Sequence, residues 1–93
     1  MKILTFRNKL LSEYRVFMGS YLRNLRKSLG LTKEAMAERL HMDVRSYSDE
    51  ESGKCLCGFI TFVIILCDVC QDRDELLKSL KGIFVRVWED EAA

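Results

Sequence analysis

The run LTKEAMAERLHMDVRSYSDEESGK, residues 31–54, decides the fold of this 93-residue chain. Thr32 precedes a short segment whose apolar residues have helical spacing, and acidic residues follow it, which together signal a helix start. We expect this helix to end near His41. Asp43 can then cap a second helix, which stops at Gly53 because glycine adopts positive φ without strain. The stretch therefore predicts two short helices joined by a tight turn.

On the N-terminal side, apolar residues recur at helical spacing for about twenty residues, over positions 10–29. Gly19 and Ser20 either divide this region into two helices or lie within one long helix. Gly30 is a good helix stop. Residues 2–6 are compatible with a short strand or with a simple tail.

On the C-terminal side, residues 59–70 are nearly all apolar, which predicts a buried and central helix. Residues 74–89 carry an apolar stripe at spacings of three and four, which predicts a C-terminal helix. Residues 83–88 favour a strand by composition, so a C-terminal strand is the competing interpretation. We expect the end of this stripe to form a dimer surface through Phe84, Val87 and Trp88.

These elements predict an all-α domain of five or six helices with the helix-turn-helix in the middle, and with short terminal strands as the alternative. The chain contains no proline and five glycines, which favours long helices. Its length fits one domain over residues 1–93. Within it we expect an N-terminal extension (1–20), a core (21–81) and the end of the C-terminal helix (82–93).

The deciding run and its flanks resemble the lambda-repressor/Cro-like, or XRE-like, helix-turn-helix family. The resemblance extends back to YLRNLRKSLG, residues 21–30, which looks like the first helix of that family. It extends forward more weakly, through residues 66–67 and 74–77, which look like its fourth and fifth helices. About sixty residues are covered.

Several positions have a physical reason to match this family. Ala37 is small enough for a close helix crossing, and Met36, Leu40 and Tyr47 supply a shared core. The resemblance also implies a structural ion pair between Glu51 and Arg26, which would hold the first helix against the third.

The resemblance implies DNA binding, with the helix at residues 43–51 in the major groove. Arg45 suits bidentate recognition of guanine, and Val44 suits contact with a thymine methyl group. The expected base-reading residues are Val44, Arg45, Ser48 and Asp49. The expected phosphate-binding residues are Thr32, Lys33, Lys54, Arg23 and Lys27.

The expected recognition helix departs from the family pattern in three ways. It is acidic, with Asp43, Asp49, Glu50 and Glu51 against Arg45 alone. Glu50 occupies a place where the family has a buried apolar residue, so either its side chain tilts outward or the helix end frays. In addition, His41 replaces the usual turn glycine, which predicts a strained or differently shaped turn.

Charge is unevenly distributed along the chain. Residues 1–33 hold eight basic residues and one acidic residue, whereas both later segments, 34–54 and 55–93, carry a net charge of −3. Phosphate attraction must therefore come chiefly from the N-terminal third. We expect a homodimeric, sequence-specific transcription regulator of the repressor or autoregulator type that binds double-stranded DNA, from a bacterium, phage or mobile element. The alternative is a non-enzymatic module that binds a protein partner, such as a phage-encoded inhibitor.

Four cysteines form a CxC…CxxC set, Cys55, Cys57, Cys67 and Cys70. Four thiolates can bind zinc, but this spacing is poor for a structural site, and Cys67 replaces a buried small residue of the family, so we expect core packing. No nucleophile pattern accompanies His41, so we expect no enzyme activity, metal or cofactor. The longest apolar run is far below the ~20 residues of a membrane span. We expect a cytoplasmic protein with reduced thiols.

Overall fold

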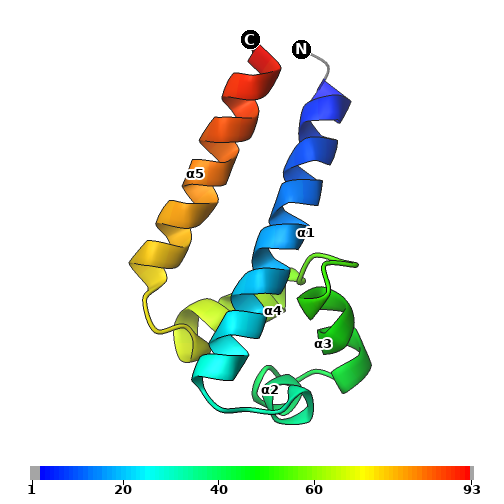
Figure 1. The fold of residues 1–93 in the computed structure, drawn as a ribbon, viewed down its shortest axis with the longest axis vertical. Helices are drawn as coiled ribbons and strands as arrows, with labels where there is room; N and C mark the ends of the chain where they lie inside the picture. The colour runs from blue at the N-terminus through cyan, green and yellow to red at the C-terminus, as the bar shows by residue number, and fades with distance from the viewer. Residues whose placement is uncertain (1–2, 93) are drawn as a thin grey trace.

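A computed structural model describes residues 3–92, and Figure 1 shows two long helices packed against a group of short ones. The elements in chain order are α1 (Ile3–Ser28), α2 (Lys33–Arg39), α3 (Val44–Glu51), α4 (Phe59–Ile64), a π-helical turn (Ile65–Val69) and α5 (Arg73–Ala92). The all-α prediction is confirmed. Both strand alternatives are wrong in the described part, because positions 3–6 and 83–88 are helical. The expected terminal segments also include residues 1, 2 and 93, which lie outside the described residues.

α1 runs without interruption through Gly19 and Ser20, across the expected boundary between extension and core. Gly19 is buried, and a Cβ added there would lie 2.7 Å from the backbone oxygen of Glu51. This glycine is therefore required by the close approach of α1 to α3, and it does not break the helix. The helix ends at Ser28, and Gly30 in the following turn has φ 70°.

The two short helices begin at the side chains that the sequence indicates. Thr32 Oγ1 accepts a hydrogen bond from the Ala35 backbone N–H, at 3.1 Å, at the start of α2. Asp43 Oδ2 accepts one from the Ser46 backbone N–H, at 3.0 Å, at the start of α3. Each contact satisfies a backbone donor that the first helical turn leaves free, and such caps are worth about 1 kcal/mol.

The apolar segment after α3 differs from the prediction of one central, buried helix. Phe59 and Ile60 at the start of α4 are exposed, and of the whole segment only Ile65 and Val69 are buried. The helix also changes from α to π geometry, with the Cys70 N–H donating to the Ile65 carbonyl at 2.8 Å. The segment packs on the core through its second half and leaves its first half in contact with water.

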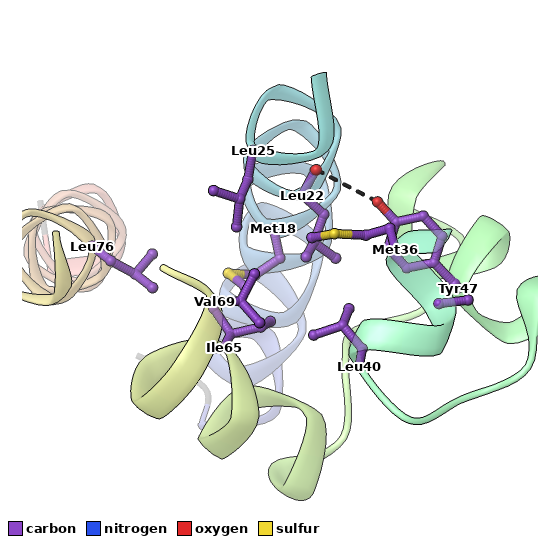
Figure 2. Close-up of a cluster of buried hydrophobic side chains, with 10 residues drawn as sticks. Met18, Leu22, Leu25, Met36, Leu40, Tyr47, Ile65, Val69 and Leu76 are labelled. Carbon is purple, nitrogen blue, oxygen red and sulfur yellow. Dashed lines mark hydrogen bonds between the residues drawn. The ribbon is translucent and has the colours of Figure 1, made fainter. Parts of the chain in front are cut away.

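The core surrounds the C-terminal half of α1, which lies in the middle of Figure 2. Fully buried side chains from every α-helix except α4, and from the π-helical turn, meet there: Leu22, Met36, Leu40, Tyr47, Ile65 and Leu76. Ala37, 2% exposed, belongs to the same cluster. The expected core residues Met36, Ala37, Leu40 and Tyr47 are thus confirmed.

α5 lies against α1 along its length, and the two helix ends meet at the tip of the molecule opposite α2 (Figure 1). The Tyr14 hydroxyl donates to the Leu80 carbonyl at 2.7 Å. Nearer the tip, the ring of Phe6 meets Phe84 and Trp88 edge-on, with centroids 5.5 Å and 5.3 Å apart. Val87 is only 4% exposed, so it packs within the chain and offers no surface to a partner.

Among residues 3–92, no helix is both long enough and apolar enough to cross a membrane.

Candidate nucleic-acid interface

The turn between α2 and α3 has the geometry that a glycine would favour, although His41 occupies it. His41 has φ 58°, in the left-handed region. Its N–H donates to the Glu38 carbonyl and the Met42 N–H donates to the Ala37 carbonyl, both at 3.0 Å. This pair of hydrogen bonds is a Schellman ending, and Gly30 ends α1 in the same way. The turn therefore keeps the glycine-type shape at the expense of backbone strain.

α3 is held against α1 by a cluster around the Glu51 carboxylate. Arg26 Nε donates to Glu51 Oε2 at 2.8 Å, and a second Arg26 nitrogen donates to Oε1 at 3.0 Å. The Tyr47 hydroxyl donates to Oε2 and also lies 3.5 Å from the Leu22 carbonyl oxygen (dashed line in Figure 2). Arg23 Nε stands 3.6 Å from Oε1. The structure thus brings together Arg26 and Glu51, the pair that the family resemblance implies.

The electrostatics of this cluster favour an ionised carboxylate. Burial alone would raise the pKa of Glu51, but the hydrogen bonds from Arg26 and Tyr47 outweigh it and lower the pKa to about 2. Burial and the bond to Glu51 raise the pKa of Tyr47, so its hydroxyl keeps its proton. The Glu51 charge is therefore compensated inside the molecule.

Glu50 contradicts the expectation that it tilts outward or that the helix end frays. α3 continues through it, and Glu50 is 7% exposed. Its Oε1 has no hydrogen-bond partner. Burial raises the pKa of its carboxyl group above the ordinary value. A buried carboxylate without a partner is destabilising, and this cost is located next to the candidate interface.

The burial of these two acids changes the surface of α3. Asp43 also has a structural role, because hydrogen bonds from the Ser46 backbone N–H and hydroxyl lower its pKa and hold it at the helix start. Asp49 is half-buried. Of four acidic residues on or beside α3, two are inside the protein and a third caps the helix.

The expected base-reading residues all lie on the outer side of α3. Val44 and Arg45 are exposed on its first turn, and Ser48 and Asp49 are half-buried one turn later. Lys33 Nζ on α2 donates to Ser48 Oγ at 3.4 Å, so one expected phosphate contact lies directly beside an expected base contact.

The remaining phosphate candidates are less closely grouped. Lys27 at the end of α1 and Lys54 after α3 are exposed. Arg23 is exposed too, although its guanidinium lies near Glu51. Thr32 uses its hydroxyl to cap α2, which leaves mainly the backbone N–H groups of that helix start for a phosphate.

The cysteines are four free thiols. Cys67 is exposed, so the prediction that it packs in the core is wrong. Burial, with a smaller contribution from Glu50, raises the pKa of Cys57 to about 11, which keeps that thiol protonated. Among residues 3–92, no group of three His, Cys, Asp or Glu side chains could hold a metal ion.

Sequence reasoning missed two contributors to this site. It assigned Tyr47 to the core but not to the Glu51 cluster, although their spacing of four residues places them on one helix face. It interpreted Gly19 as a possible break, because nothing local reveals that the backbone of α3 approaches this position.

An α2–turn–α3 unit with an exposed first turn on α3, braced against α1, defines a helix-turn-helix domain. The sequence profile of the helix-turn-helix domain family matches residues 18–80, and the chain belongs to this family, which is part of the XRE/Cro-like group. Membership indicates a DNA-binding regulator at a general level, in a family that is typically non-enzymatic. No curated protein and no solved structure matched the chain.

Proposed function

We propose that this protein is a sequence-specific DNA-binding transcription regulator of the repressor or autoregulator type, acting in the cytoplasm of a bacterium or on behalf of a phage or mobile element. One observation carries the proposal: the acids at the C-terminal end of α3 are internal, whereas Arg45 at its N-terminal end is exposed. In this fold the first turn of the third helix is the part that reaches base edges.

The placement of charged side chains on the folded surface supports DNA binding more than the net charge of the sequence does. With Glu50 and Glu51 buried, the acids that remain at the surface of α3 and its cap are Asp43 and half-buried Asp49, and neighbouring α2 adds exposed Glu34 and Glu38. Exposed Lys33, Arg45 and Lys54 stand against them, and exposed Arg23 and Lys27 of α1 add to the positive side. Phosphates can therefore be met by cations on both sides of α3.

The proposed roles follow from this placement. Arg45 reads guanine through two hydrogen bonds, and Val44 contacts a thymine methyl group. At the neighbouring base pair the Ser48 hydroxyl donates or accepts, and the Asp49 carboxylate accepts. Lys33, Lys54 and the start of α2 near Thr32 hold phosphates, with Arg23 and Lys27 on the flank. No cofactor, metal or catalytic residue is needed for this activity.

We also propose that the protein acts as a homodimer. One short helix with four reading positions makes few base contacts, and two copies double the site on a palindromic operator.

The test is binding to DNA from the gene's own upstream region, measured by fluorescence anisotropy at several salt concentrations. Wild type should bind with an affinity that falls steeply as salt rises. Arg45→Ala should lose about 1–3 kcal/mol of DNA-binding free energy and should distinguish the bases less well at one base pair of the site. Arg73→Ala is the matched control, because it removes the same charge from an exposed site at the start of α5 and should bind like wild type.

Absence of salt-dependent binding by wild type would refute DNA recognition. Asp49 in the middle of the reading surface would then favour the second candidate, a protein-binding module that uses the same scaffold, because a carboxylate there repels phosphate but pairs well with a basic protein surface. Binding that Arg45→Ala leaves unchanged would refute only the docking assignment.

A further inference from the structure

A large apolar face on α4 and α5 stays exposed among the described residues, although Phe6 of α1 touches Phe84 and Trp88 at one end of it. Phe59 and Ile60 at the start of α4 are 77% and 68% exposed. On α5, Leu77, Phe84 and Trp88 are half-exposed at spacings of seven and four. We call these five residues the α4–α5 face. Single exposed apolar residues are ordinary on monomers, but a set of large ones on adjoining elements marks an interaction site.

A groove between α1, α4 and α5 adjoins this face, and Phe59 is the member of the face that lines it. It has a volume of about 320 Å³ and is lined almost entirely by apolar side chains, among them Tyr14 of α1, Phe59 and Phe62 of α4, and Leu80 of α5. Leu80 is three residues after Leu77 and four before Phe84, so all three share one side of α5. The exposed stripe of α5 therefore continues into the groove.

The area of the face fits a stable contact between proteins. If each large side chain offers roughly 150–250 Å², the exposed fractions amount to about 550 Å² of apolar surface per copy. A standard interface takes about 800 Å² from each partner, of which somewhat more than half is apolar. The face alone can thus supply the apolar part of a standard interface.

The charge and shape of the face suit a second copy of the same chain. A two-fold interface pairs one surface with itself, so it tolerates no concentration of a single charge sign. Residues 55–67, from the loop before α4 to the π-helical turn, contain no charged side chain. A projecting pair, Phe59 and Ile60, also stands beside a groove, and two-fold rotation can place each projection opposite the other copy's groove.

We propose that the α4–α5 face is the contact between two copies of this chain, with Phe59 of each copy seated in the groove of the other. The arrangement explains why an almost uncharged segment is exposed: it is central to the dimer and not to the single chain. The proposal rests on the proposed function and deepens it, because it assigns the surface through which the homodimer forms. This interface includes Phe84 and Trp88 of the contact expected from the sequence, leaves out buried Val87, and does not involve Arg45.

Sedimentation equilibrium without DNA tests this proposal. Wild type should show a concentration-dependent monomer–dimer equilibrium. Phe59→Asp should weaken the dimer by at least roughly 30-fold in dissociation constant, the size expected for a hot-spot residue. Leu77→Asp, on α5 three residues before the groove residue Leu80, should weaken it as well. Because both side chains are exposed, circular dichroism and thermal melting of the variants should remain close to those of wild type.

Val16→Asp is the matched control. Val16 is 64% exposed on α1, and its position two residues from both Tyr14 and Met18, which line the groove, places it on the opposite side of that helix. This variant should dimerise like wild type. A folded Phe59→Asp that still forms the dimer would overturn the proposal. A wild type that stays monomeric at every concentration would also overturn the proposal. That holds even if the monomer binds an apolar dye such as anilinonaphthalene sulfonate in the groove.

The DNA measurement separates this proposal from the one on which it rests. Monomeric Phe59→Asp should retain salt-dependent binding to DNA but lose the affinity gained from pairing. A wild-type dimer that binds no DNA would refute the proposed function alone. DNA binding by a wild type that never dimerises would refute the homodimer and its α4–α5 contact, but not DNA recognition.

Discussion

Replacing Glu50 by leucine is expected to stabilise the protein at neutral pH, which is unusual for the removal of a charged residue. The native side chain is 7% exposed, and one of its carboxylate oxygens has no hydrogen-bond partner. An unsatisfied buried polar group costs about 1–3 kcal/mol, and a charged one more. Leucine fills a similar volume without needing a partner. We therefore expect the free energy of unfolding to rise by about 1–3 kcal/mol. For a domain of this size, each kcal/mol raises Tm by about 4–8 °C.

The pH dependence distinguishes this cause from general improvement in packing. Burial raises the folded-state pKa of Glu50 above the ordinary value of 4.5. The folded protein therefore binds that proton more tightly than the unfolded chain does. The penalty is absent below about pH 4.5 and grows as pH rises through the folded-state pKa. The advantage of Glu50→Leu should accordingly shrink as pH falls from 7 to 4.5.

Urea unfolding followed by circular dichroism at both pH values measures the effect. Glu50→Gln is the informative companion, because it removes the charge but keeps an amide that still lacks a partner, and it should fall between wild type and leucine. Glu51→Gln is the opposite control and should destabilise, since Glu51 is ionised and hydrogen-bonded. A leucine variant that is less stable than wild type at pH 7, or whose gain does not depend on pH, would refute the reasoning.

Four further substitutions test single positions. Gly19→Ala should destabilise by about 1–3 kcal/mol, because its Cβ would lie 2.7 Å from the Glu51 backbone oxygen, whereas Gly82→Ala, with nothing within 4 Å, should stabilise by about 0.5–1 kcal/mol in thermal melts. His41→Gly should add about 0.5–1 kcal/mol in urea titrations by relieving its positive φ, and an unchanged midpoint would count against strain there. Arg26→Met should raise the pKa of Glu51 from about 2, so that acid unfolding, followed by circular dichroism, begins at higher pH; an unmoved midpoint would show that the pair does not hold the carboxylate ionised.

Helix limits around α2 and α3 were predictable because they depend on neighbours in the chain. Thr32 and Asp43 accept from N–H groups three residues ahead, and Gly30 and Gly53 close their helices through bonds within six residues. Such signals act at short range and need no knowledge of the fold. The pairing of Arg26 with Glu51 was accessible only through resemblance to a family, since 25 residues separate them.

What the tertiary structure alone decided is which side chains of these helices are buried. Comparison with the family pattern predicted that Glu50 tilts outward or that the helix end frays, but Glu50 is buried. Residues 59–70 were expected to form one buried helix, but only their second half packs on the core. Burial depends on where α1, α4 and α5 meet after the chain has folded, and no local spacing reports that. Amino-acid sequence thus determined the helices, their caps and the helix-turn-helix. Packing decided that two acids leave the surface of α3 and that an apolar face remains on α4 and α5.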